Sequence, residues 1–154
     1  MARTTLLTTS DPALNAYGAT TIDRSALTKG KTIVGTPVFT QSSSAFRSGY
    51  RSMTNIGDYV EYEELLTAGT WALVLETVTA ASGGTFEVYI DGVKVATNDT
   101  YIASGGGATR TETTGLTIAA TGKHTIRLIV IAKNAASSAT TCRISGYTMT
   151  RTGA

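Results

Sequence analysis

Cysteine and histidine are nearly missing from this sequence, which has one of each among 154 residues. A disulfide needs two cysteines and a cysteine-based zinc site needs several, so a lone Cys142 supports neither within the chain. A single histidine, His124, cannot build a multi-histidine metal site. We therefore expect no metal site and no cofactor. We expect Cys142 to be buried on a strand, and His124 to hold a half-buried structural position.

Charge is also scarce: Asp, Glu, Lys and Arg make up 16% of the residues, against roughly 25% in a typical soluble domain. The formal net charge of +2 is too small to predict nucleic acid or a membrane surface as a partner. No stretch reaches the roughly 18 consecutive apolar residues of a membrane span. The opening MARTTLLTTSDPAL lacks the continuous apolar run of a secretory signal, so we expect no cleaved export signal.

Threonine, serine and glycine take the place of charge, with 30 Thr, 12 Ser and 16 Gly. The branched threonine side chain packs well on a pleated sheet, and serine and glycine are typical of turns. The 42% of hydrophobic residues can form one core, and the length suits a single domain. This composition favours strands and turns over helices.

Two segments repeat one pattern, in which a glycine precedes strict alternation of apolar residues. TAGTWALVLETV (67–78) places Trp71, Leu73 and Leu75 on one face, and ATGKHTIRLIVI (120–131) alternates in the same way. Period-two alternation is typical of a strand with one buried face. We therefore expect Trp71 in the core rather than in a binding site.

Turn residues divide the remaining strands. TFEVYIDGVKVAT (85–97) alternates on both sides of Asp91 and Gly92, which predicts a hairpin with a type I′ turn. Pro37 confines KTIVGTPVF (31–39) to a sheet edge or a bend, because proline cannot donate to a sheet ladder.

The closing segment TTCRISGYTMTR (140–151) alternates, with Ile144 on one face and Tyr147 and Met149 on the other. Over the whole chain we count about eight or nine short strands, with turn signals at intervals of about 8 to 12 residues and no long helical period. The pattern predicts an all-β protein, an antiparallel sandwich or small barrel over residues 29–154.

Residues 1–28 precede this domain as an extended arm. SDPALNAYG (10–18) combines a capping serine or aspartate, a proline and a final glycine, which predicts a short helical turn. An apolar arm gains stability by lying on its own domain or on a neighbour, and both alternatives stay open. Together with the loop FRSGYRS (46–52), where arginine and aromatic residues are typical interface anchors, the arm predicts an assembly interface: Leu6, Leu7, Leu14, Ile22, Phe46, Arg47 and Arg51.

A resemblance to a known family follows from the order of five segments. GDYVEY, TAGTWALVLETV, GGTFEVYIDGVKVA, ATGKHTIRLIVI and CRISGYTMT succeed one another as in jelly-roll carbohydrate-binding modules. The chain most resembles the family-six type, over about residues 45–150. The resemblance implies a jelly-roll β-sandwich of two antiparallel sheets, with ligands bound by loops at one end or by a concave sheet face.

At several positions where the family has sugar-binding residues, this sequence has a different residue. Such modules open with a Glu-rich strand that contacts sugar or calcium, whereas NAYGATTI (15–22) contains no Glu. The Asn expected before the last strand falls at Thr140 or Thr141. Tyr59 stands where the family often has Trp. The predicted glycan-binding residues are Tyr50, Tyr59, Tyr101 and Tyr147.

Catalytic groups are few, so we do not expect an enzyme. A Ser-His-Asp triad would need His124, whose neighbours Ile126 and Leu128 indicate a structural strand position. Glu61 and Glu63 share a strand face about 7 Å apart, a spacing found in glycosidases, but a solvated strand face explains them better.

The chain shows one jelly roll, no signal sequence and no attached catalytic domain, a combination typical of virion proteins of tailed bacteriophages. We predict a virion protein made in the host cytoplasm: a capsid decoration, cementing or head-fibre subunit. It would bind the major capsid protein or a tail or fibre component as a homotrimer, with interfaces multiplied by symmetry. The alternative is a non-catalytic carbohydrate-binding module or host-glycan adhesin.

Overall fold

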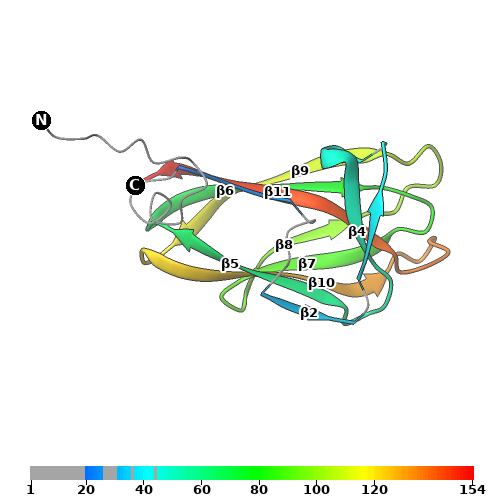
Figure 1. The fold of residues 1–154 in the computed structure, drawn as a ribbon, viewed down its shortest axis with the longest axis horizontal. Helices are drawn as coiled ribbons and strands as arrows, with labels where there is room; N and C mark the ends of the chain where they lie inside the picture. Colours follow the sequence, from blue (N-terminus) through cyan, green and yellow to red (C-terminus); the bar gives the residue numbers. More distant parts are fainter. Residues whose placement is uncertain (1–19, 26–30, 36, 44) are drawn as a thin grey trace, which may run out of the picture.

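The computed structural model describes residues 20–25, 31–35, 37–43 and 45–154. These residues form eleven strands in two antiparallel sheets, packed face to face as a sandwich (Figure 1). Sheet A contains β1 (Thr21–Ser25), β3 (Val38–Gln41), β4 (Gly49–Met53), β6 (Gly69–Val78), β9 (Ala108–Ile118) and β11 (Cys142–Gly153). Sheet B contains β2 (Thr32–Val34), β5 (Tyr59–Leu66), β7 (Gly84–Ile90), β8 (Val93–Asp99) and β10 (Gly122–Lys133).

The predicted all-β antiparallel sandwich is thereby confirmed. The structure has more strands than the eight or nine expected, because strands as short as β2 and β3 carry almost no periodic signal. One 3₁₀ turn, η1 (Phe46–Ser48), precedes β4. No helix in the described residues has the length and apolar character of a membrane span.

Among the described strands, β3 and β9 end the main order of sheet A, and β2 and β8 end that of sheet B. Sheet A runs β3-β4-β11-β6-β9, and β1 pairs with β11 beyond the stretch that β4 occupies. Sheet B runs β2-β5-β10-β7-β8. The connections that leave β4, β6, β8 and β10 gather at one end of the sandwich, opposite the tight turns and the end of β11 (Figure 1).

The core lies between the sheets and contains the alternating apolar residues of the long strands. Trp71, Leu73 and Leu75 are at most 1% exposed, as their alternation predicted. The Trp71 indole N–H donates to the Thr67 carbonyl oxygen at 2.9 Å, which satisfies its one polar group. Cys142 is also fully buried, as expected.

Both turn predictions are confirmed. Asp91 and Gly92 have φ angles of 50° and 81°, the positive values that a type I′ turn requires between β7 and β8. Pro37 lies between β2 and β3, where the chain passes from the edge of sheet B to the edge of sheet A.

The prediction for the closing strand is wrong in one respect. Ile144, Tyr147 and Met149 are all at most 3% exposed, whereas simple alternation placed Ile144 on the opposite face. The pairing of β11 with β6 shifts register between Ile144 and Gly146. A bulge adds one residue at this point and returns the following side chains to the core.

Part of the predicted N-terminal arm belongs to the sandwich. Residues 21–25 form β1, which pairs with β11 from Thr21 opposite Thr150 to Ser25 opposite Gly146. Ile22 is 4% exposed and lies in the core cluster. The predicted helical turn at 10–18 lies outside the described residues.

Candidate functional site

The four tyrosines predicted to bind glycan lie in different parts of the sandwich. Tyr50 is half-buried on the outer face of sheet A, with the Arg143 guanidinium 5.9 Å from its ring centre. Tyr59 is half-buried on the outer face of sheet B, and Tyr101 is half-buried in the loop after β8. Tyr147 is 1% exposed, because the bulge in β11 turns it inward. Tyr147 therefore cannot contact a surface ligand, and the others do not share one face.

The predicted assembly residues likewise do not gather on one surface. Ile22 is part of the core, and Arg51 lies near the buried Tyr62. Burial raises the pKa of Tyr62, and the charge of Arg51 opposes that rise. Three others lie outside the described residues: Leu6, Leu7 and Leu14.

The η1 turn, which carries the last two predicted assembly residues, folds onto its own domain. Arg47 donates from Nε to Glu76 at 2.6 Å and also pairs with Asp23. The Arg110 guanidinium lies 4.4 Å from the ring centre of Phe46. The Arg47 hydrogen bond lowers the pKa of Asp23. Phe46 and Arg47 thus fasten this loop to the outer face of sheet A.

The acidic residues considered for catalysis each have a cationic partner. Glu61 is 2.7 Å from Arg127, and Glu63 pairs with Lys31 at 3.3 Å and Lys123 at 2.8 Å. The two lysines lower the pKa of Glu63 by hydrogen bonding and charge. The Glu63 carboxylate is thereby stabilised as an anion, which suits an exposed ion pair better than proton transfer.

His124 is similarly occupied. Its Nδ1 lies 2.6 Å from Asp91 Oδ2, and its Nε2 lies 2.9 Å from the Ala120 carbonyl oxygen. Both ring nitrogens therefore face acceptors, and neither is left for a serine hydroxyl.

The outer face of sheet B carries a cluster of charged, aromatic and aliphatic side chains. Core residues alternate with outward ones along β5, β10 and β7, and the strand register aligns the outward ones in rows. One row crosses β5, β10 and β7 as Glu61, Arg127 and Tyr89, and the next as Tyr59, Ile129 and Glu87. We call these six residues the sheet B face.

Arg127 is the centre of the sheet B face. Its guanidinium donates from Nε to Glu61 Oε2 at 2.9 Å and lies 4.6 Å from the ring centre of Tyr59. The Glu61 carboxylate is mostly buried beneath it, at 8% exposure. An ion pair combined with a cation–π contact holds the planar guanidinium flat against the sheet.

Tyr89 is fixed on the other side of Arg127. Its hydroxyl donates to Glu87 Oε2 at 2.6 Å, and Lys94 of β8 donates to Glu87 Oε1 at 3.0 Å. These hydrogen bonds lower the pKa of Glu87, and the bond to Glu87 raises the pKa of Tyr89. The tyrosine therefore stays neutral and oriented over the ordinary pH range.

Two shallow hollows flank Arg127 on this face. One, of about 260 Å³, is lined by Glu61, Asp91, Gly92, Thr125 and Arg127. The other, of about 280 Å³, is lined by Tyr89, Gly92, Arg127, Ile129 and Ile131. One hollow is polar and the other largely apolar, and they share the arginine between them.

The sequence predicted only some of the residues of the sheet B face. Tyr59 was predicted as a glycan contact, and Glu61 was placed correctly on an outward strand face. Arg127 and Tyr89 were missed, although their outward positions follow from the alternation of their strands. Ile129 and Ile131 carry a further signal, because apolar residues at outward positions break the usual pattern of a solvated sheet.

Neither a known protein-family model nor a curated protein matches this sequence. Solved structures do match its fold. The chain superposes on a xanthan lyase of Paenibacillus with a TM-score of 0.72 and 18% identity, over 84% of this chain and 13% of the lyase. It therefore corresponds to a small part of that enzyme.

Isolated carbohydrate-binding modules match over nearly their whole length. The CBM36-1 domain of a xylanase from the hindgut metagenome of Trinervitermes trinervoides gives a TM-score of 0.62 at 17% identity, over 87% of this chain and 99% of that one. A family 35 module of Clostridium thermocellum gives 0.60 at 13% identity, over 87% and 100%. The jelly-roll sandwich of these modules is thus confirmed as the fold of this chain. The modules named here belong to families 35 and 36, and the predicted resemblance was to the family-six type.

A third neighbour raises the question of a metal. A CBM36 module solved with calcium and xylotriose gives a TM-score of 0.54 at 21% identity, over 84% of this chain and 97% of that one. Among the residues that the structure describes, no three His, Cys, Asp or Glu side chains come together in a way that could hold a metal ion.

Proposed function

We propose that this chain is a non-catalytic carbohydrate-binding domain and that the sheet B face is its glycan site. The fold neighbours that it covers end to end are carbohydrate-binding modules, which favours this alternative over the virion prediction. The observation that carries the proposal is the position of Arg127 between Tyr59 and Tyr89, above two adjoining hollows.

The chemistry of the face matches a sugar. A pyranose ring has apolar C–H faces and a rim of hydroxyl groups, so it needs flat apolar surfaces beside oriented hydrogen-bonding groups. Tyr89 and Ile129 offer the apolar surface, while Arg127 and Glu61 offer donors and acceptors in fixed orientations.

The charges of the face indicate a neutral glycan. Glu61 pairs with Arg127 and Glu87 pairs with Lys94, so each charge has a neighbour of opposite sign. An acidic sugar would have to compete with the carboxylates for those cations. We therefore expect neutral oligosaccharides to bind more tightly than uronic acids.

The first test is a glycan array of neutral and acidic oligosaccharides, followed by calorimetry with the best ligand. Tyr89→Ala should weaken binding about tenfold or more, the loss of a central aromatic contact. Tyr101→Ala, in the loop after β8, is the matched control and should bind as the unmodified chain does. Equal binding by Tyr89→Ala with a loss in Tyr101→Ala would move the site to the loops. No binding to any glycan would refute the proposal.

The predicted virion role stays a prediction, together with the homotrimer and the capsid or tail partners. The contacts described above do not bear on it, and Phe46 and Arg47 are engaged within the chain.

A further inference from the structure

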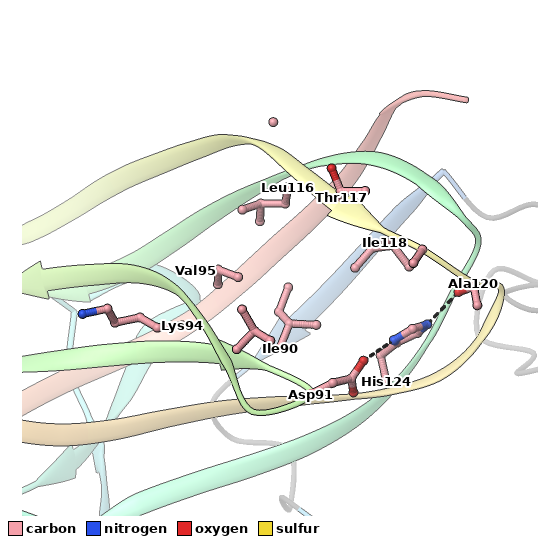
Figure 2. A pocket seen from close by; sticks show the side chains of 12 residues that line it. Ile90, Asp91, Lys94, Val95, Leu116, Thr117, Ile118, Ala120 and His124 are labelled. Atoms are coloured by element: carbon pink, nitrogen blue, oxygen red, sulfur yellow. Dashed lines mark hydrogen bonds and ion pairs between the residues drawn. The ribbon is translucent and has the colours of Figure 1, made fainter.

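A separate pocket lies at the edge of the sandwich where β8 and β9 face each other. Each of these strands is the outer strand of its sheet, and no other strand of the described residues covers the gap between them. The pocket has a volume of about 600 Å³, within the range of roughly 300–1,000 Å³ typical of small-molecule sites. Figure 2 shows Ile90 and Val95 from the hairpin facing Leu116 and Ile118 from β9, with His124 and Asp91 nearby.

Two bulges, one on each edge strand, meet at this pocket. In β8 the register shifts opposite Val88 and Tyr89, which leaves Val95 as the extra residue. In β9 a second shift, opposite Trp71 and Leu73, includes Gly115 with a φ of 72°. Bulges bend a strand and re-aim its side chains, and they are common beside binding sites. Val95 and Leu116 are therefore turned to line the pocket.

Most of the lining is aliphatic. Val95 and Leu116 are only partly buried and pack against the core, so the pocket floor is continuous with it. Val93, at the rim, is 67% exposed. The aliphatic lining residues are Ile90, Val93, Val95, Leu116, Ile118, Ala119 and Ala120. A surface of this kind suits an apolar molecule rather than a sugar.

One end of the pocket is polar and rich in acceptors. Asp91 Oδ1 accepts the Thr125 backbone N–H at 2.8 Å, and Oδ2 faces His124 Nδ1 at 2.6 Å. His124 Nε2 faces the Ala120 carbonyl. The free lone pairs of the carboxylate and carbonyl oxygens can still accept a hydrogen bond, and they disfavour a ligand anion.

We propose that this edge pocket binds a small uncharged alcohol, an apolar molecule that carries one hydroxyl group. The hydrocarbon part lies against Val95 and Leu116, and the hydroxyl donates to the acceptors at the Asp91 end. The aliphatic lining faces the gap between the sheets and not the sheet B face, and the edge pocket shares only Asp91 with the hollows beside Arg127.

The test is an NMR titration of the whole ¹⁵N-labelled chain with benzyl alcohol, compared with benzoate. Benzyl alcohol should shift the amides of Val95, Leu116 and His124, with a Kd on the order of 1 mM for so small a molecule. Benzoate has the same ring but a negative charge, and it should bind several-fold more weakly. Asp91→Asn should remove much of this discrimination.

Two tryptophan variants serve as matched controls. Val95→Trp should fill the pocket and abolish the shifts, while Val38→Trp, at a 60% exposed position on β3, should leave them unchanged. If Val95→Trp fails to fold, the Asp91→Asn comparison still tests the proposal. Shifts confined to the sheet B face, no shifts at roughly ten times the expected Kd, or equal binding of both probes to the unmodified chain would overturn it.

Discussion

At the scale of single residues, the sandwich keeps a carboxylate inside its core by surrounding it with donors. Glu64 is 2% exposed and accepts hydrogen bonds from Arg24 Nε at 2.7 Å, Arg24 Nη2 at 2.6 Å and the Tyr147 hydroxyl at 2.6 Å. The bond to Glu64 raises the pKa of Arg24, while burial and then Glu64 raise the pKa of Tyr147. Both donors therefore stay protonated at any ordinary pH.

Removal of the cation should be costly. Arg24→Met leaves Glu64 buried without its partner, and we expect a loss of about 2–4 kcal/mol in the free energy of unfolding, since Arg24 is partly exposed. The combined Arg24→Met and Glu64→Leu change should recover most of that loss. Urea denaturation measures both. Lys123→Met, at the exposed end of a surface pair, is the control and should leave the midpoint unchanged. An equal effect of the two single changes would contradict this account.

The buried thiol gives a second prediction at this scale. Burial raises the pKa of Cys142 from 9.0 to about 12, so the folded protein keeps the thiol neutral where an unfolded chain would ionise it. Stability should therefore fall as the pH rises above about 9. At pH 8 the native thiol should resist iodoacetamide and react once urea unfolds the chain, as followed by mass spectrometry. Rapid labelling of the native protein would show that the site opens.

At the scale of elements, Gly92 and Gly83 each require glycine, but for different physical reasons. Gly92 has a φ of 81° and open space where a Cβ would stand, so only its backbone conformation excludes other residues. A Cβ on Gly83 would collide with the Thr100 carbonyl oxygen, where the chain leaving β6 runs beside the chain leaving β8.

Alanine substitutions at these two positions should therefore lower the free energy of unfolding by different amounts. Gly92→Ala should cost about 1 kcal/mol in stability from the left-handed backbone alone. Gly83→Ala should cost more, about 2–4 kcal/mol, because backbone atoms must move apart. Thermal unfolding of the two variants side by side gives the order, and a smaller effect at Gly83 would refute it.

The strands and turns also show which structural features a local sequence pattern can predict. The alternation around Trp71 and the Asp91-Gly92 pair predicted their strands and hairpin correctly, because burial of one face and a positive φ leave direct signs in the sequence. The bulge after Ile144 leaves no such sign, since the extra residue is set by pairing with β6. For the same reason the candidate site was only half predicted. Arg127 and Tyr89 become neighbours through strand register, which joins segments far apart in the chain.

At the scale of the whole molecule, β1 ties the start of the described chain to the last strand. Ile22 enters the core, Arg24 reaches Glu64 across the sandwich, and Asp23 pairs with Arg47. Residues 29–154, the domain predicted from sequence, would lack all of these contacts.

A shortened chain of residues 29–154 should therefore lose more than about 4 kcal/mol of stability, since it gives up a buried apolar side chain and the partner of a buried carboxylate. Circular dichroism during urea denaturation, compared with the full chain, measures this loss. Unchanged stability of the shortened chain would mean that β1 packs without contributing.

The position of β11 also has a consequence for synthesis. The strand is synthesised after β1 to β10, yet it pairs with β1, β4 and β6 and so forms the middle of sheet A. Until it emerges, β6 and β4 present unpaired edges, and the core lacks Tyr147 and Met149. The sandwich therefore cannot close until β11 has been made, and it then closes through pairings between distant segments that form slowly. A chain whose synthesis stops before β11 would have no means of closing sheet A and would keep the edges of β4 and β6 exposed to other chains.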